Sequence, residues 1–243
     1  MSLRELILAV QFLTRLPTPR LRNFQPDELP RCAIHFPLVG LIIGALLVLP
    51  LLALDARPWL AAVLALLVWV WVTGALHIDG LGDVADALGA AHRSPERFLE
   101  VLKDPHIGVF GAVAIILQLL LKLVLLAEVM ATAHPPWAIV LIPAWARWGT
   151  LWWSRQLPSL HPGMAERFSW TPGVAAIGGW ALALGALSLW LAPVLLLALP
   201  LTLLITVYWR RRLGGVSGDC LGASTEVTET VLLLALVLVP AAI

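Results

Sequence analysis

Three aspartates recur at helical spacing in HIDGLGDVADALG, residues 77–89. Asp79, Asp83 and Asp86 stand at positions i, i+4 and i+7, so a helix would carry all three carboxylates on one face. At bilayer depth each ionised carboxylate would cost about 2.5–3.5 kcal/mol without compensation. Hard oxygen ligands suit Mg²⁺, which keeps several waters and bridges to substrate phosphates. We therefore predict a magnesium site here. The simpler alternative is that Asp79 caps a helix while Asp83 and Asp86 face water.

Small residues surround these acids. Gly80, Gly82 and Ala85 would leave room for a bulky phosphate beside the carboxylates. His77 lies at the end of an apolar run, where a histidine serves either as an interfacial hydrogen-bond donor or as a substrate contact.

A second polar stretch, LKDPHIGVFG, leads into another apolar run. Asp104 is placed to cap the helix that follows. Capping does not explain Lys103 and His106, which are suited to contacting anionic substrate oxygens or to moving a proton.

A third stretch, GGVSGDCLGASTE, is rich in glycine and hydroxyl groups. Backbone amides in such a loop can line an anion site, and Asp219 would add a metal ligand. The candidate substrate-binding residues here are Gly214, Gly215, Ser217 and Gly218. The alternative is a flexible loop in which Ser224 or Thr225 caps the last helix.

Arg147 lies inside the apolar segment that contains PAWARWGTLWW. An ionised group within a membrane span needs a partner, so we expect Arg147 to pair with a carboxylate or with a substrate phosphate.

The composition is that of a membrane protein. Hydrophobic residues make up 60% of the 243 residues and charged residues 13%, against about 45–50% and about 25% in soluble domains. Twelve Trp fit the two bilayer interfaces. The net charge of +1 gives no indication of nucleic-acid binding. Cys32 and Cys220 lack the spacing of a metal site or an evident disulfide. Arg4 and Glu5 argue against a cleaved signal peptide.

The apolar runs are continuous, which favours helices over barrel strands. We predict an all-α, polytopic membrane bundle of about seven transmembrane helices, preceded by an interfacial helix at 3–16. The predicted spans are 34–54, 58–78, 107–131, 136–153, 173–192, 194–209 and 227–243. Spans 173–192 and 194–209 form a hairpin that is broken near Pro193. The longest polar insertion, 79–106, is too short for a separate domain, so we expect residues 1–243 to form one membrane-embedded domain.

Basic residues indicate the orientation. Alternating spans place 13 of the 16 Lys and Arg residues on one side, in segments 4–31, 79–106, 154–172 and 210–226. Because cytoplasmic loops collect basic residues, this side is predicted to be cytoplasmic. Arg57 lies opposite. The acidic and glycine-rich stretches then share the cytoplasmic face.

Five blocks in order resemble the adenosylcobinamide-GDP ribazoletransferase, or cobalamin synthase, family: FLTRLPTP, FPLVGLIIG, GALHIDGLGDVADALG, LKDPHIGVFG and GGVSGDCLGAS. The likeness covers nearly the whole chain. Ser217 stands where Thr is expected and Gly82 where Ala is usual, and neither difference removes a proposed ligand.

The resemblance implies a Mg²⁺-dependent transfer at the inner membrane of a prokaryote, with the active site facing the cytoplasm. A hydroxyl of α-ribazole, or of its 5′-phosphate, would attack the cobinamide-linked phosphorus of adenosylcobinamide-GDP. GMP would leave, and adenosylcobalamin or its 5′-phosphate would form. Asp79, Asp83, Asp86 and Asp219 would hold one or two Mg²⁺ ions. An aspartate such as Asp83, or else His106, would accept the hydroxyl proton, and Lys103 and Arg147 would stabilise the leaving phosphate. The oligomeric state stays open.

Two other functions fit parts of the pattern. A CDP-alcohol phosphotransferase would use similar metal chemistry on lipids, but Arg93 in AAHRS stands at the wrong spacing from the first aspartates. An ion-coupled transporter also places carboxylates near broken helices, but it would show two related halves with matching interruptions.

Overall fold

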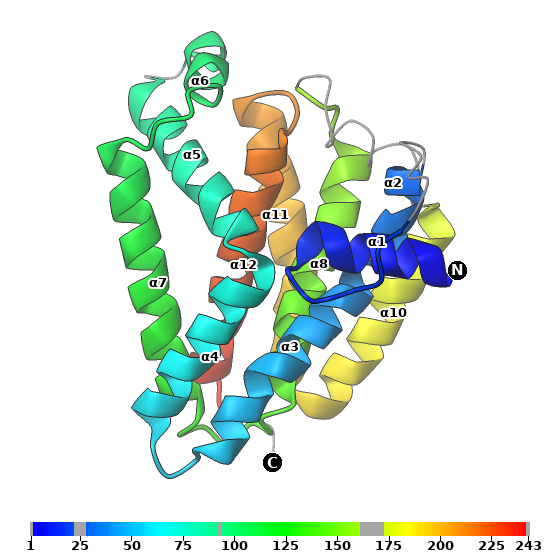
Figure 1. Cartoon of the computed structure of the whole chain (residues 1–243), viewed down its shortest axis with the longest axis vertical. Coiled ribbons are helices and arrows are strands. Elements are labelled where there is room, and N and C mark those ends of the chain that lie inside the picture. The colour runs from blue at the N-terminus through cyan, green and yellow to red at the C-terminus, as the bar shows by residue number, and fades with distance from the viewer. Residues whose placement is uncertain (1, 22–27, 92–93, 161–172, 242–243) are drawn as a thin grey trace.

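The chain folds into a bundle of helices (Figure 1). The computed structural model describes residues 2–21, 28–91, 94–160 and 173–241. Within those ranges the only β-type pairing is an isolated bridge between Ser159 and Val216. The α-helices are α1 (Leu3–Leu13), α2 (Glu28–Cys32), α3 (Phe36–Ala53), α4 (Pro58–Thr73), α5 (Leu76–Ala90), α6 (Pro95–Val101), α7 (Val109–Val129), α8 (Ala138–Gln156), α10 (Val174–Leu191), α11 (Ala198–Arg212) and α12 (Gly218–Leu238). Two 3₁₀ turns, η1 (Ala33–His35) and η2 (Pro193–Leu197), complete the order.

Helix α8 runs through the centre of the bundle, and every residue from 141 to 151 is buried. Helix α3 packs against α8 so closely that the backbones of the two helices are in contact. A Cβ added to Gly40 would lie 2.5 Å from the Cα of Ala144, and one added to Gly44 would lie 2.5 Å from the carbonyl oxygen of Val140. Small residues thus allow the two helices to approach as closely as membrane helices do at small-residue interfaces.

Five helical segments of the described chain are long and apolar enough to cross a membrane: Pro30–Ala53, Val109–Val129, Val174–Leu191, Pro193–Arg212 and Gly218–Leu238. The bent pair of α4 and α5 would make a sixth. This confirms an all-α polytopic membrane protein. Helix α8, predicted as the span 136–153, is not among these segments, because Trp145, Trp148, Trp152 and Trp153 together with Arg147 and Arg155 lower its hydropathy.

The predicted span 58–78 breaks instead of continuing. Helix α4 ends at Thr73, and Gly74 and Ala75 both adopt left-handed backbone angles with φ of 60°. Helix α5 then departs at 86° to α4. The aspartate stretch, predicted as part of a polar insertion, therefore forms a helix packed between α7 and α12.

The last helix begins earlier than predicted. Helix α12 starts at Gly218, and the hydroxyl of Ser217 caps it by accepting a hydrogen bond from the backbone N–H of Cys220 at 3.2 Å. The predicted caps Ser224 and Thr225 lie inside the helix. Most of the glycine-rich stretch is therefore helical and not a loop.

The connections from α5 to α7 and from α11 to α12 lie at the same end of the bundle (Figure 1). The α3–α4 and α7–α8 connections and the C-terminus lie at the opposite end (Figure 1). The glycine-rich stretch and the C-terminal end of the acidic stretch therefore lie toward the same end of the bundle, in line with the prediction that both stretches share one face of the membrane. Arg22, Arg93 and Arg167 lie outside the described residues. Helix α1 lies across the bundle at about the middle of its height, as a short amphipathic helix with a capping box of Ser2 and Glu5 (Figure 1).

Candidate active site

Helices α5 and α12 cross in close contact, and this crossing brings the acids of two distant segments together. A Cβ on Gly80 would lie 3.0 Å from both the Cα and the carbonyl oxygen of Asp219. A Cβ on Gly222 would lie 3.3 Å from the carbonyl oxygen of His77. The two glycines therefore set the distance between the helices, and they place Asp219 beside the first turns of α5.

Four carboxylates interact at this crossing. The negative charges of Asp79, Asp219 and Asp86 all repel the charge of Asp83. Asp79 is exposed, whereas Asp83, Asp86 and Asp219 are half-buried. Among the described residues, no three His, Cys, Asp or Glu side chains are grouped closely enough to hold a metal ion by themselves. The arrangement is thus a set of hard oxygen donors whose charges repel one another, and not a finished cage.

Asp86 has a second partner in the start of α7. Its two oxygens accept hydrogen bonds from the backbone N–H groups of Gly108, at 2.7 Å, and Gly111, at 2.9 Å. A carboxylate at a helix N-terminus satisfies unpaired N–H groups and interacts favourably with the positive end of the helix dipole. Asp86 therefore caps α7. The predicted cap, Asp104, does not, because α7 begins only at Val109 and a carboxylate from α5 already occupies its N-terminus.

Neither Gly80 nor Gly82 leaves the predicted room for a phosphate. The space beside Gly80 is taken by the backbone of α12, as described above. A Cβ on Gly82 would lie 2.9 Å from the Cδ1 atom of Ile115 on α7. Both glycines are buried because they admit neighbouring helices, so their absent side chains serve packing.

The four candidates before α12 differ in their surroundings. Gly214, with φ of 74°, and Gly218 have nothing within 4 Å of an added Cβ. Gly215 packs against the carbonyl oxygen of Pro158, and Ser217 is buried as the cap of α12. The hydroxyl of Ser217 also lies 3.4 Å from Oδ2 of Asp219. Only Gly214 and Gly218 therefore keep open space for a ligand.

Lys103 and His106 are exposed in the connection between α6 and α7. Nδ1 of His106 lies 2.7 Å from Oδ1 of Asp104, which also accepts the backbone N–H of His106 at 3.1 Å. These hydrogen bonds lower the pKa of the Asp104 carboxyl. His106 stands two residues before Gly108, whose N–H binds Asp86, so the loop ends beside the acidic crossing.

Arg147 lies away from any surface. It is fully buried, and its guanidinium forms an ion pair with Glu229 of α12. The prediction of a carboxylate partner is confirmed, whereas a direct contact between Arg147 and a leaving phosphate has no place in this geometry. A second guanidinium nitrogen lies 3.4 Å from Nδ1 of His77. His77 is itself only 7% exposed, so its predicted contact with substrate is not favoured either.

Sequence reasoning missed a buried cluster around this pair. Nζ of Lys122 lies 2.7 Å from Glu226 and 2.6 Å from Glu229. Each of these ions lies inside a segment that can cross the membrane, and intramembrane charges are rare and generally functional. That rule was the signal available in the sequence for Lys122, Glu226 and Glu229.

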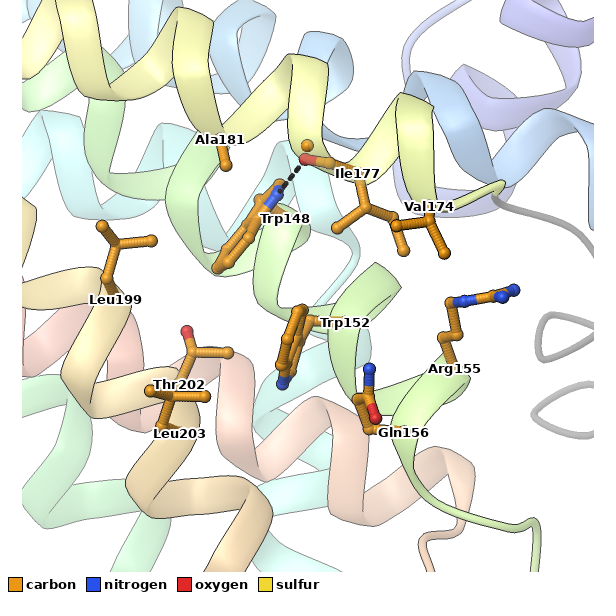
Figure 2. Close-up of a pocket in the computed structure, with 11 residues that line it drawn as sticks. Trp148, Trp152, Arg155, Gln156, Val174, Ile177, Ala181, Leu199, Thr202 and Leu203 are labelled. Atoms are coloured by element: carbon orange, nitrogen blue, oxygen red, sulfur yellow. Dashed lines mark hydrogen bonds between the residues drawn. The ribbon is translucent and has the colours of Figure 1, made fainter.

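A separate cavity of about 320 Å³ opens between α8, α10 and α11 (Figure 2). Figure 2 shows Trp148 and Trp152 along its wall, with ring centroids 6.0 Å apart, and Arg155 at one end. On the opposite face of α8, Thr150 meets Thr225 of α12. Helix α8 therefore separates this cavity from the acidic crossing.

Comparison with known proteins identifies the family. The family model for cobalamin-5-phosphate synthases matches residues 5–237. The chain belongs to this family. It is 57% identical to an adenosylcobinamide-GDP ribazoletransferase of Laribacter hongkongensis, with 96% of each chain covered. It is 50% identical to the enzyme of that name from Thiobacillus denitrificans, covering 96% of this chain and 94% of the relative. The relative of the same name from Novosphingobium aromaticivorans is 49% identical, over 96% of this chain and 95% of its own. No solved structure matches the chain.

Proposed function

We propose that this protein is a membrane transferase that joins the phosphocobinamide group of adenosylcobinamide-GDP to a hydroxyl of α-ribazole or of its 5′-phosphate. The observation that carries the proposal is the family match along nearly the whole chain, together with relatives of that name at about 50% identity or more. The crossing of α5 and α12 supplies a matching set of acids.

The proposed reaction is a single displacement at phosphorus. The ribazole hydroxyl oxygen forms a bond to the cobinamide-linked phosphorus, the bond from that phosphorus to the bridging oxygen breaks, and GMP leaves with the electron pair. Such transfers ask the protein mainly to position the reactants and to neutralise charge.

We assign Asp79, Asp83 and Asp219 as the residues that would hold Mg²⁺. The donors fit, because they are hard oxygen ligands whose mutual repulsion a cation would relieve. A complete set of protein ligands is not required, since Mg²⁺ is usually held by one or two carboxylates with water and substrate phosphates. The ion would supply charge neutralisation on the diphosphate. Asp86 is not assigned as a Mg²⁺ ligand, because both of its oxygens accept hydrogen bonds from α7.

The hydroxyl proton has a defined acceptor in this proposal. If Nδ1 of His106 donates to Asp104, the neutral ring keeps its lone pair on Nε2, which can take a proton. A carboxylate that fixes the tautomer of a histidine in this way also steadies the ring. We therefore favour His106 over an aspartate as the base, with Lys103 in the same loop as the cation for the leaving GMP. The open backbone at Gly214 and Gly218 would face the same substrate.

The basic end of the bundle is assigned to the cytoplasm of a bacterium, and the protein to the inner membrane. The proposal agrees with the clustering of the α5–α7 and α11–α12 connections at one end, since cytoplasmic loops collect Lys and Arg.

The test uses purified protein in lipid vesicles with adenosylcobinamide-GDP, α-ribazole and Mg²⁺, and it measures the release of GMP by chromatography. We expect GMP from the wild type and from Asp55→Asn, an exposed acid in the α3–α4 connection. Asp83→Asn should lose about 100-fold or more, in line with the loss of a positioned charge in a catalytic site. Absence of GMP from the wild type would overturn the assigned reaction, and full activity of Asp83→Asn would remove Asp83 from the site.

A further inference from the structure

Two cations and two anions are buried together at the centre of the bundle. Lys122 of α7 binds both Glu226 and Glu229 of α12, and Arg147 of α8 binds Glu229. All four side chains are at most 4% exposed. Their formal charges cancel, so the cluster is neutral as a whole.

Neutrality alone does not explain why ions are used here. Removing charged groups from water is costly, and apolar side chains of similar volume often stabilise a protein as well or better. Stability alone therefore does not account for a buried ion cluster of this kind.

The cluster extends to the first turn of α5. Arg147 binds Glu229 through one guanidinium nitrogen and approaches Nδ1 of His77 at 3.4 Å with another. The backbone of His77 rests against Gly222 of α12. His77 follows the left-handed Gly74–Ala75 turn by two residues, and no side chain caps α5 at this end. The contact with Arg147 thus holds a helix start that lacks a cap of its own.

We propose that Arg147 and Glu229 are positioning residues that hold the His77 ring and so fix Asp79 and Asp83 opposite Asp219. His77 stands two residues before Asp79, on the turn that brings the acids of α5 to α12. The inference rests on the proposed function, because it takes these aspartates as the metal-binding set. Arg147 and His77 then serve the reaction without touching the substrate.

A matched pair of substitutions at His77 tests this. In His77→Asn the side-chain oxygen can accept the hydrogen bond that Nδ1 accepts, whereas His77→Leu keeps the bulk and removes the acceptor. The first readout is Mn²⁺ binding to the purified protein in detergent, followed by electron paramagnetic resonance. The second is the Mg²⁺ concentration that gives half-maximal GMP release.

Partners that orient metal ligands typically account for about 10- to 100-fold in affinity, so His77→Leu should weaken Mn²⁺ binding and raise the Mg²⁺ requirement by that factor. His77→Asn should stay near the wild type. The control is Gln118→Met, because Gln118 binds Glu226 and Thr230 on the same cluster, at 2.8 Å and 2.7 Å. It should lower the thermal unfolding temperature and leave Mn²⁺ affinity unchanged.

Three results would overturn the proposal: wild-type Mn²⁺ affinity in His77→Leu, equal losses in the Leu and Asn variants, or an equal loss of affinity in Gln118→Met. If His77→Leu does not fold, Arg147→Lys replaces it. Lys keeps the charge beside Glu229 but lacks the fork that reaches two partners, so the same loss of Mn²⁺ affinity is expected, and wild-type affinity would refute the inference.

Asp83→Asn separates this inference from the proposed function. If that variant binds Mn²⁺ like the wild type, the metal assignment itself fails. If it loses Mn²⁺ while His77→Leu and Arg147→Lys do not, the metal assignment stands and only the positioning role is wrong.

Discussion

Asp86 offers the sharpest distinction between a structural and a metal-binding carboxylate. The perturbation is Asp86→Ala, with Asp86→Asn as the milder change, because Asn keeps one acceptor oxygen but loses the charge. In the structure Asp86 binds two N–H groups of α7, at Gly108 and Gly111. These residues lie 22 and 25 positions away along the chain, so the cap also ties α7 to α5.

The magnitude follows from those two hydrogen bonds. A bond to a charged group contributes about 1.5–3 kcal/mol, and loss of an N-cap costs about 0.5–2 kcal/mol. The two bonds serve one cap and do not add fully, and water reaches the half-buried Asp86. We therefore expect Asp86→Ala to lower the free energy of unfolding by about 1–3 kcal/mol, and Asp86→Asn by less.

The assay is unfolding of the purified protein in mixed micelles, paired with hydrogen exchange of the first turn of α7. Asp86→Ala should speed exchange at Gly108 and Gly111 and lower stability, while Mn²⁺ affinity falls far less than in Asp83→Asn. Unchanged stability and exchange together with lost Mn²⁺ binding would refute the capping role and return Asp86 to the metal site.

Two further predictions concern the helix crossing and the orientation. Gly80→Ala should lower both activity and thermal stability, because its Cβ would meet the backbone of Asp219 at 3.0 Å, whereas Gly218→Ala, with open space around it, should keep its stability; equal stability of the two variants would contradict the close crossing. A cysteine at position 97 on α6 should react with a membrane-impermeant maleimide only from the cytoplasmic side, and one at position 57 only from the other side. The native Cys32 and Cys220 are buried and should give little background, and labelling of both new cysteines from one side would break the assigned topology.

Much of the fold could be predicted because long apolar runs can only be helices in a bilayer. The predicted spans 34–54 and 107–131 agree with α3 and α7 to within two residues at each end. The break before α5 could not be predicted in this way. Ala75 adopts a left-handed conformation that alanine rarely takes, so no local residue preference indicates it.

The start of α12 was missed for a different reason. Its first turns read as a polar loop, yet their hydroxyls are satisfied within the helix. Ser224 donates to the carbonyl oxygen of Cys220 at 2.6 Å, Thr225 to that of Leu221 at 2.9 Å, and Thr228 to that of Ser224 at 2.7 Å. Back-bonding of this kind lets a polar sequence remain helical inside the bundle.

Prediction from the sequence reaches a similar limit at the site. Spacing alone shows that Asp79, Asp83 and Asp86 share one helix, because spacing is a local property. Which acid meets a helix end, and which cation meets which anion, depends on contacts between distant segments. Arg147 and Glu229 are 82 residues apart, and nothing near Arg147 in the sequence distinguishes a carboxylate partner from a phosphate.

The central claim is that acids from α5 and α12 jointly bind a divalent cation that also holds the diphosphate of the substrate. The most direct measurement is pulsed electron–nuclear double resonance of Mn²⁺ bound to the purified protein with adenosylcobinamide-GDP. The account predicts a ³¹P coupling in the wild type that disappears in both Asp83→Asn and Asp219→Asn. A ³¹P coupling that persists unchanged in both variants, or protein-bound Mn²⁺ without any ³¹P coupling, would contradict it.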